Sequence, residues 1–98
     1  MTDTETKIQA AGLTAPRVTP DDVDAAVDMV EYFRPVGTMT ICIVTLKNGF
    51  TVTGESACAS PDNYNEEIGR DIALRNAKEK IWPLLGYLLK EQMYLEGN

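Results

Sequence analysis

The sequence contains no histidine among its 98 residues, and its two cysteines, Cys42 and Cys58, stand alone. Ser-His-Asp triads, Cys-His nucleophiles and His-ligated zinc sites all need an imidazole. Two isolated cysteines build neither a disulfide scaffold nor a structural zinc site. A glycine-rich phosphate-binding loop is also missing. These absences predict a protein that is not an enzyme and that carries no cofactor and no metal.

Basic residues are scarce as well, because 9 Lys and Arg face 15 Asp and Glu for a net charge of −6. Broad nucleic-acid binding needs clustered basic residues and is therefore not expected. The apolar runs are far shorter than the roughly 20 residues that cross a bilayer. The acidic start of the chain, Met1 to Glu5, does not resemble a secretory signal. We expect a cytoplasmic protein with reduced thiols and no membrane association.

The length of the chain predicts one domain. Residues 1–17 are small and polar, which indicates a flexible N-terminal arm before a single domain over residues 18–98. Thr19 suits the N-cap of a helix, and Pro20 suits its first position. The apolar residues that follow recur at helical spacing and predict a helix from Pro20 to Phe33: Val23, Ala26, Val27 and Val30.

Two segments rich in β-branched residues, 38–46 and 50–56, flank Asn48-Gly49. This dipeptide favours a two-residue type I′ turn and therefore predicts an antiparallel hairpin. Thr45 then faces Val52, and the predicted core face holds Met39, Ile41, Ile43, Phe50 and Val52. The first strand is apolar on its other face too, so we expect a helix or a second subunit to cover that face: Cys42, Val44 and Leu46.

A second helix is expected from Asp62 to Trp82, opened either by Ser60-Pro61 or by a capping box of Asn63 and Glu66. Pro83 is expected to kink it, and a short helix follows from Leu84 to about Tyr94. The predicted fold class is α+β, with an N-terminal helix, a two-stranded hairpin, a long helix kinked at a proline and a short C-terminal helix. A chain this small with broadly apolar elements is expected to form a homo-oligomer.

Polar, aromatic and basic side chains gather around the predicted start of the second helix. Such a junction offers free backbone N–H groups to an anion, and arginines on the helix can clamp phosphates. The candidate ligand-binding residues are Asn63, Tyr64, Arg70, Arg75, Glu55 and Ser56. Helix capping, core packing and a solvated helix face are the structural alternatives for the same residues.

The predicted first helix carries acidic residues on the side opposite its apolar face: Asp21, Asp24, Asp28 and Glu31. They are candidate partner-binding residues, since an acidic stripe can imitate a nucleic-acid backbone, although such stripes are more often solvated faces. Two further side chains have alternative interpretations. Cys58 is either a reactive thiol near a helix start or a small buried hydrophobe, and Trp82 either stacks on a base or anchors the packing.

An ordered series of short motifs runs from Leu46 to Leu89 and covers a little under half of the chain. In this series the sequence resembles a family of small tailed-phage proteins, named after gene forty-nine of one lytic phage and gene sixty-six of another. The matching residues are Asn48-Gly49-Phe50, Gly54-Glu55-Ser56-Ala57-Cys58, Asn63-Tyr64-Asn65, Glu67, Gly69, Ala73, Asn76, Ala77, Lys80-Ile81-Trp82-Pro83-Leu84 and Gly86-Tyr87-Leu88-Leu89.

The resemblance implies a phage accessory protein without an established enzymatic activity, acting in the host cytoplasm. Small phage proteins of this kind often counter host defences or modulate host factors, which is an association and not a mechanism. Three hypotheses follow: a binding protein directed at a host factor, a sponge that sequesters a cyclic nucleotide or an NAD-derived immune signal, and a nucleic-acid mimic. The expected partner is thus a host protein or a small anionic nucleotide.

Overall fold

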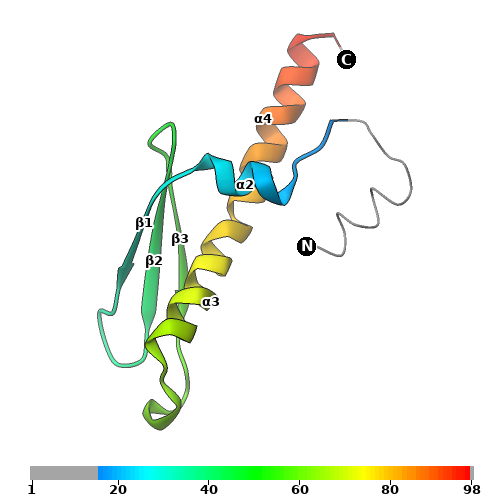
Figure 1. Ribbon diagram of the computed structural model, residues 1–98. Helices are drawn as coiled ribbons and strands as arrows, with labels where there is room; N and C mark the ends of the chain where they lie inside the picture. Colours follow the sequence, from blue (N-terminus) through cyan, green and yellow to red (C-terminus); the bar gives the residue numbers. More distant parts are fainter. Residues whose placement is uncertain (1–15, 98) are drawn as a thin grey trace, which may run out of the picture.

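The computed structural model describes residues 16–97, in which helices pack on one face of an antiparallel sheet (Figure 1). The expected arm at residues 1–17 lies almost wholly outside the described residues. The sheet order is β1-β2-β3. The elements in chain order are α2 (Pro20–Ala26), β1 (Val27–Phe33), β2 (Thr40–Leu46), β3 (Thr51–Ser56), the 3₁₀ turn η1 (Pro61–Asn63), α3 (Glu66–Glu79) and α4 (Ile81–Leu95). The predicted α+β class is confirmed.

The first helix begins as predicted but ends much earlier. The Thr19 hydroxyl accepts a hydrogen bond from the Asp22 N–H, and the Asp22 carboxylate accepts one from the Thr19 N–H, which completes a capping box. The prediction of a helix through Phe33 is wrong, because the chain leaves α2 at Ala26 and continues as β1 beside β2. β1 is rich in β-branched and aromatic residues, and pairing with β2 satisfies its backbone. The sheet therefore has three strands and not two.

The β2–β3 hairpin is present, but its loop is one residue longer than predicted. The Gly49 N–H donates to the Leu46 carbonyl at 2.9 Å, and Gly49 has a φ of 90°, whereas Asn48 keeps a negative φ. This geometry is a type I turn closed by a glycine bulge and not a type I′ turn. Thr45 consequently faces Thr51, and Val44 faces Val52.

A register shift of one residue exchanges the two faces of a strand. The predicted core face of Met39, Ile41, Ile43 and Phe50 is therefore wrong, and Phe50 is 55 % exposed. The buried face carries Val52 and the residues expected on the opposite side: Cys42, Val44 and Leu46. The expectation that a helix covers this second face is confirmed, because α3 packs against β2 and β3. No element within residues 16–97 packs on the outer face of the sheet.

The long helix begins and bends at other residues than predicted. Asn65 caps α3, since its side-chain oxygen accepts from the Ile68 N–H at 3.0 Å, and Ser60-Pro61 opens η1 instead. The break falls at Lys80, and Pro83 lies in the first turn of α4. A proline ring clashes with the carbonyl four residues earlier, here that of Glu79, and has no N–H to donate to it. The helical hydrogen bonds of α3 therefore stop before Pro83, whose missing donor is tolerated at a helix start.

Cys42 is completely buried between the sheet and α3. This burial raises the pKa of its thiol above the ordinary 9.0, although the Lys78 ammonium opposes the shift. The folded protein thus holds the thiol proton more tightly than the unfolded chain, so its stability contribution is present below the unfolded pKa and is lost as pH rises. We predict a level free energy of unfolding from pH 7 to about 8 and a decline of up to about 1.4 kcal/mol per pH unit above about 9.

Urea denaturation across this pH range measures the decline. The matched variant is Cys42→Ala, which is expected to be less stable at every pH because it leaves a cavity. Its stability is expected to fall less between pH 8 and 9.5 than that of the native protein. Equal slopes in the two proteins would contradict a titrating, buried Cys42 thiol.

Candidate functional site

Two arginines stack on two tyrosines at the end of the sheet where α3 begins. The Arg34 guanidinium carbon lies 4.1 Å from the centre of the Tyr64 ring, and that of Arg70 lies 5.2 Å from the centre of the Tyr32 ring. Tyr32 belongs to β1 and Arg70 to α3, while Arg34 follows β1 and Tyr64 follows η1. We call these four residues the tyrosine–arginine cluster.

Local backbone structure fixes the two loop residues of this cluster. The Arg34 Nε–H donates to the Gly37 carbonyl at 2.7 Å, and Gly37 has a φ of 56°, which only glycine adopts readily. Tyr64 stands directly before Asn65, the residue that caps α3. The stacked guanidinium of Arg34 keeps its two Nη groups for other acceptors, since only Nε is used by the turn.

The two arginines of the cluster differ in whether an acidic residue of the described range pairs with them. Arg70 forms an ion pair with Glu66 one turn earlier on α3, at 2.7 Å. Arg34 forms no ion pair with any residue of the described range 16–97. Burial raises the pKa of Tyr32, and the neighbouring Cys42 and Asp71 add to the rise while Arg70 and Lys78 oppose it. The Tyr32 hydroxyl therefore stays protonated as a hydrogen-bond donor throughout the physiological pH range.

Two hollows adjoin the cluster, in addition to a narrow gap of about 40 Å³ that all four of its residues line. The larger, of about 620 Å³, is shallow and is lined by Tyr32, Tyr64, Arg70 and neighbouring acidic residues. The second, of about 260 Å³, lies between β3 and α3 and includes Tyr64 and Asn63 in its wall. Thr40 is buried at the base of the cluster, and its hydroxyl has no hydrogen-bond partner within the described chain. Small-molecule sites have volumes of this order, with a few polar groups that converge on the ligand.

Five of the six predicted ligand-binding residues lie around these hollows. Tyr64 and Arg70 line the larger one, and Asn63, Glu55 and Ser56 line the smaller one. Ser56 also has a structural role, because its hydroxyl donates to the Gly69 carbonyl of α3 at 2.6 Å. Similarly, the Glu55 backbone carbonyl accepts from the Asn76 side chain at 2.8 Å, and the exposed Glu55 adds a negative charge to the wall of the smaller hollow.

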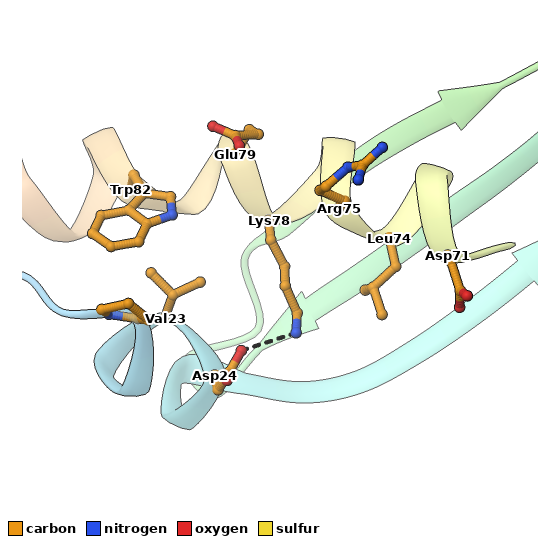
Figure 2. Close-up of a pocket in the computed structure, with 9 residues that line it drawn as sticks. Val23, Asp24, Asp71, Leu74, Arg75, Lys78, Glu79 and Trp82 are labelled. Carbon is orange, nitrogen blue, oxygen red and sulfur yellow. Dashed lines mark hydrogen bonds and ion pairs between the residues drawn. The ribbon is translucent and has the colours of Figure 1, made fainter. Parts of the chain in front are cut away.

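Arg75 lies apart from the other predicted residues, in a cleft between α2 and α3 (Figure 2). This cleft has a volume of about 310 Å³ and contains two basic and three acidic side chains. Lys78 is already paired with Asp24 at 2.9 Å. Trp82 packs against the core at the end of the cleft, which supports the packing interpretation, although its Nε1–H is buried without a partner in the described residues. The larger hollow beside the cluster also holds three acidic side chains, so charge alone does not separate the two places, and the cluster differs from the cleft in that its guanidinium groups stack on aromatic rings.

The four predicted partner-binding acids do not form one helical stripe. Asp21 and Asp24 lie on α2, whereas Asp28 and Glu31 lie on β1, because the predicted helix ends at Ala26. Asp24 is occupied by its ion pair with Lys78. An extended acidic surface that imitates nucleic acid therefore has no support from this arrangement.

Sequence reasoning missed Tyr32 and Arg34, half of the cluster. The predicted helix from Pro20 to Phe33 includes Tyr32 and ends directly before Arg34, so the prediction connects neither residue with Tyr64. The available signal was the composition of residues 27–33, in which β-branched and aromatic residues outnumber strong helix formers. Both cysteines are free thiols, and the half-buried Cys58 donates through its Sγ to the Ser60 carbonyl. Within residues 16–97 no three potential ligands gather as a metal site.

Two further observations concern the whole chain. No helix within residues 16–97 is long and apolar enough to cross a membrane. No curated protein and no solved structure matches the chain. A family model, in contrast, matches residues 18–93, which include all of the helices and strands except the last two residues of α4, and it confirms the resemblance seen in the motifs from Leu46 to Leu89. The chain belongs to the phage protein (N4 Gp49/phage Sf6 gene 66) family.

Proposed function

We propose that this phage protein is an accessory effector that counters host defence by binding without chemistry, and that its ligand is a small anionic nucleotide. The ligand class includes cyclic nucleotides and NAD-derived immune signals, which the protein sequesters in the host cytoplasm. The observation that carries this proposal is the tyrosine–arginine cluster, in which separate elements bring two guanidinium groups and two aromatic rings together.

The chemistry of the cluster suits such a ligand. Guanidinium groups bind phosphate oxygens through paired N–H donors, and stacking on a ring holds each planar group in a defined orientation. Nucleobases stack on tyrosine rings and on guanidinium planes. Arg34 adds a positive charge that no acidic residue of the described range neutralises, and this charge offsets part of the repulsion that the net charge of −6 exerts on an anion.

A protein that sequesters a ligand must bind it and leave it chemically intact. The chain has no histidine to act as a general base, and of the carboxylates that line the larger hollow Glu66 is already paired with Arg70. These properties support binding without turnover. A host protein remains the alternative partner, but no surface of the described residues favours a particular host protein.

Arginine substitutions test the site. We predict that Arg34→Ala and Arg70→Ala each weaken nucleotide binding by about 10- to 100-fold, since each removes a charge-assisted phosphate contact worth roughly 1.5–3 kcal/mol. Titration calorimetry with a panel of cyclic and NAD-derived nucleotides measures the dissociation constants. Arg75→Ala is the matched control, because it removes the same charge from α3 outside the cluster, and its affinity is expected to stay within about twofold.

Thermal melting of the three variants separates lost contacts from lost folding. Arg70→Ala removes an exposed ion pair with Glu66, worth about 0.3–0.5 kcal/mol, and the stacking on Tyr32, worth about 0.5–1 kcal/mol, so this variant is expected to remain folded with a loss of stability below about 1.5 kcal/mol. Binding that is equally weakened by all three substitutions would point to general electrostatics. Binding that is weakened by Arg75→Ala alone would move the site to the α2–α3 cleft.

A further inference from the structure

The C-terminal part of α4 extends beyond the sheet and α3 (Figure 1). Its first turns belong to the core, where Ile81 is fully buried and Leu84 and Leu85 pack against it. Later apolar side chains lie in solvent: Tyr87, Leu88, Tyr94 and Leu95 are 68 %, 56 %, 71 % and 75 % exposed. A single helix of this length is marginal in water without packing. The projecting end of α4 therefore needs an apolar partner.

An apolar groove lies at the base of the same helix. It has a volume of about 400 Å³ and is formed between the β2–β3 loop and α4, with Leu46, Phe50, Leu85 and Leu88 among its lining residues. Phe50 is 55 % exposed at its edge. The chain thus presents an apolar projection and an apolar groove on one continuous surface.

We propose that a second copy of this chain fills the groove, with two α4 helices packed antiparallel about a two-fold axis. Leu85 and Leu95 are separated by about 15 Å along the helix, at 1.5 Å per residue. A two-fold axis level with the middle of this segment places Leu95 of each chain beside the groove of the other. The same two-fold rotation places the projecting helix end of each chain at the groove of the other chain, as an isologous interface requires.

The area and the charges agree with this arrangement. The exposed parts of Phe50, Tyr87, Leu88, Tyr94 and Leu95 amount to on the order of 600 Å² per chain, from ordinary side-chain areas. Their mutual burial removes about 1,200 Å², the lower limit for a specific, stable interface. Lys47 lies at the groove and forms no ion pair in the part of the chain that the structure describes. Glu96 follows Leu95 at the projecting end of α4. In the proposed dimer, Glu96 of each chain therefore lies near the oppositely charged Lys47 of the other chain.

Sedimentation equilibrium of the full chain tests the proposal. We expect the native protein to associate in multiples of two and Leu95→Asp to raise the dissociation constant of the pair at least 100-fold. Phe33→Asp is the matched control, because Phe33 is a 49 % exposed apolar residue on the outer face of the sheet. Association is expected to survive this control substitution. Circular dichroism excludes unfolding as a cause, and Leu95 is too exposed for its replacement to disturb the core.

A second experiment exchanges the charges of Lys47 and Glu96. Lys47→Glu and Glu96→Lys are each expected to weaken the association about threefold to tenfold, and the double variant is expected to restore it. A monomeric native protein at about 100 μM would overturn the proposal. It would also be overturned if Phe33→Asp, and not Leu95→Asp, dissociated the protein, because the outer sheet face would then be the interface.

Discussion

Replacing Gly54 with alanine is expected to lower the free energy of unfolding by more than about 3 kcal/mol, because the added methyl group has no space. Gly54 lies on β3 directly beneath α3. A Cβ atom at this position would overlap the Ala73 carbonyl oxygen and the Ala77 nitrogen and lie 2.9 Å from the Ala77 Cα. All three are backbone atoms, so α3 as a whole has to move away from the sheet.

This loss is large for a domain of about 80 residues, whose total stability is only about 5–10 kcal/mol. A thermal melt is expected to show a decrease of at least about 12 °C in the melting temperature, or no cooperative transition. Gly86→Ala is the matched control, since a Cβ at Gly86 meets nothing within 4 Å. Alanine is the better helix former by about 1 kcal/mol, so this variant is expected to be slightly more stable than the native protein. A Gly54→Ala variant as stable as the native protein would contradict the packing of α3 on β3.

Shortening Ile81 to alanine is expected to destabilise the protein by about 3 kcal/mol. Ile81 is the first residue of α4 and is completely buried, with the largest side-chain volume among the fully buried residues. It therefore anchors the bend between α3 and α4 in the core. The substitution removes apolar atoms from the core and leaves a cavity that the surrounding helices fill only in part.

The same substitution at Ile68 provides the control. Ile68 lies in the first turn of α3 and is 56 % exposed. Because alanine has the higher helix propensity and little buried area is lost, the stability of Ile68→Ala is expected to stay within about 0.5 kcal/mol of the native value. Urea denaturation measures both variants. Equal losses at Ile81 and Ile68 would contradict a core that extends to the start of α4.

The parts of the fold that depend on local chemistry were predictable. Thr19 and Pro20 fixed the start of α2, and Asn48-Gly49 indicated the hairpin between β2 and β3. The type of turn was not predictable, since the same dipeptide suits a two-residue loop and a three-residue loop with a glycine bulge. That choice decides the register and, with it, which face of β2 is buried. The local sequence therefore predicts the hairpin but does not predict which of its two faces is buried.

The end of α2 and the cluster depend on long-range contacts. Val23, Ala26, Val27 and Val30 fit helical spacing, but the backbone of β1 pairs with β2 at residues 41–46, a partner that spacing alone does not reveal. Tyr64 and Arg70 were identified because they lie near a predicted helix start. Tyr32 and Arg34 come to that site only through the pairing of β1 with β2. These two residues could therefore not be assigned to the cluster without knowledge of the strand pairing.

Retention of a nucleotide by the native protein tests whether the tyrosine–arginine cluster is a nucleotide site. The purified protein is mixed with cyclic and NAD-derived nucleotides, free ligand is removed, the protein is denatured, and the released material is analysed. We expect an unaltered nucleotide to be released in amounts comparable to those of the protein. A chemically altered nucleotide would contradict binding without chemistry, and the absence of any retained nucleotide would contradict the assignment of the tyrosine–arginine cluster as a nucleotide site.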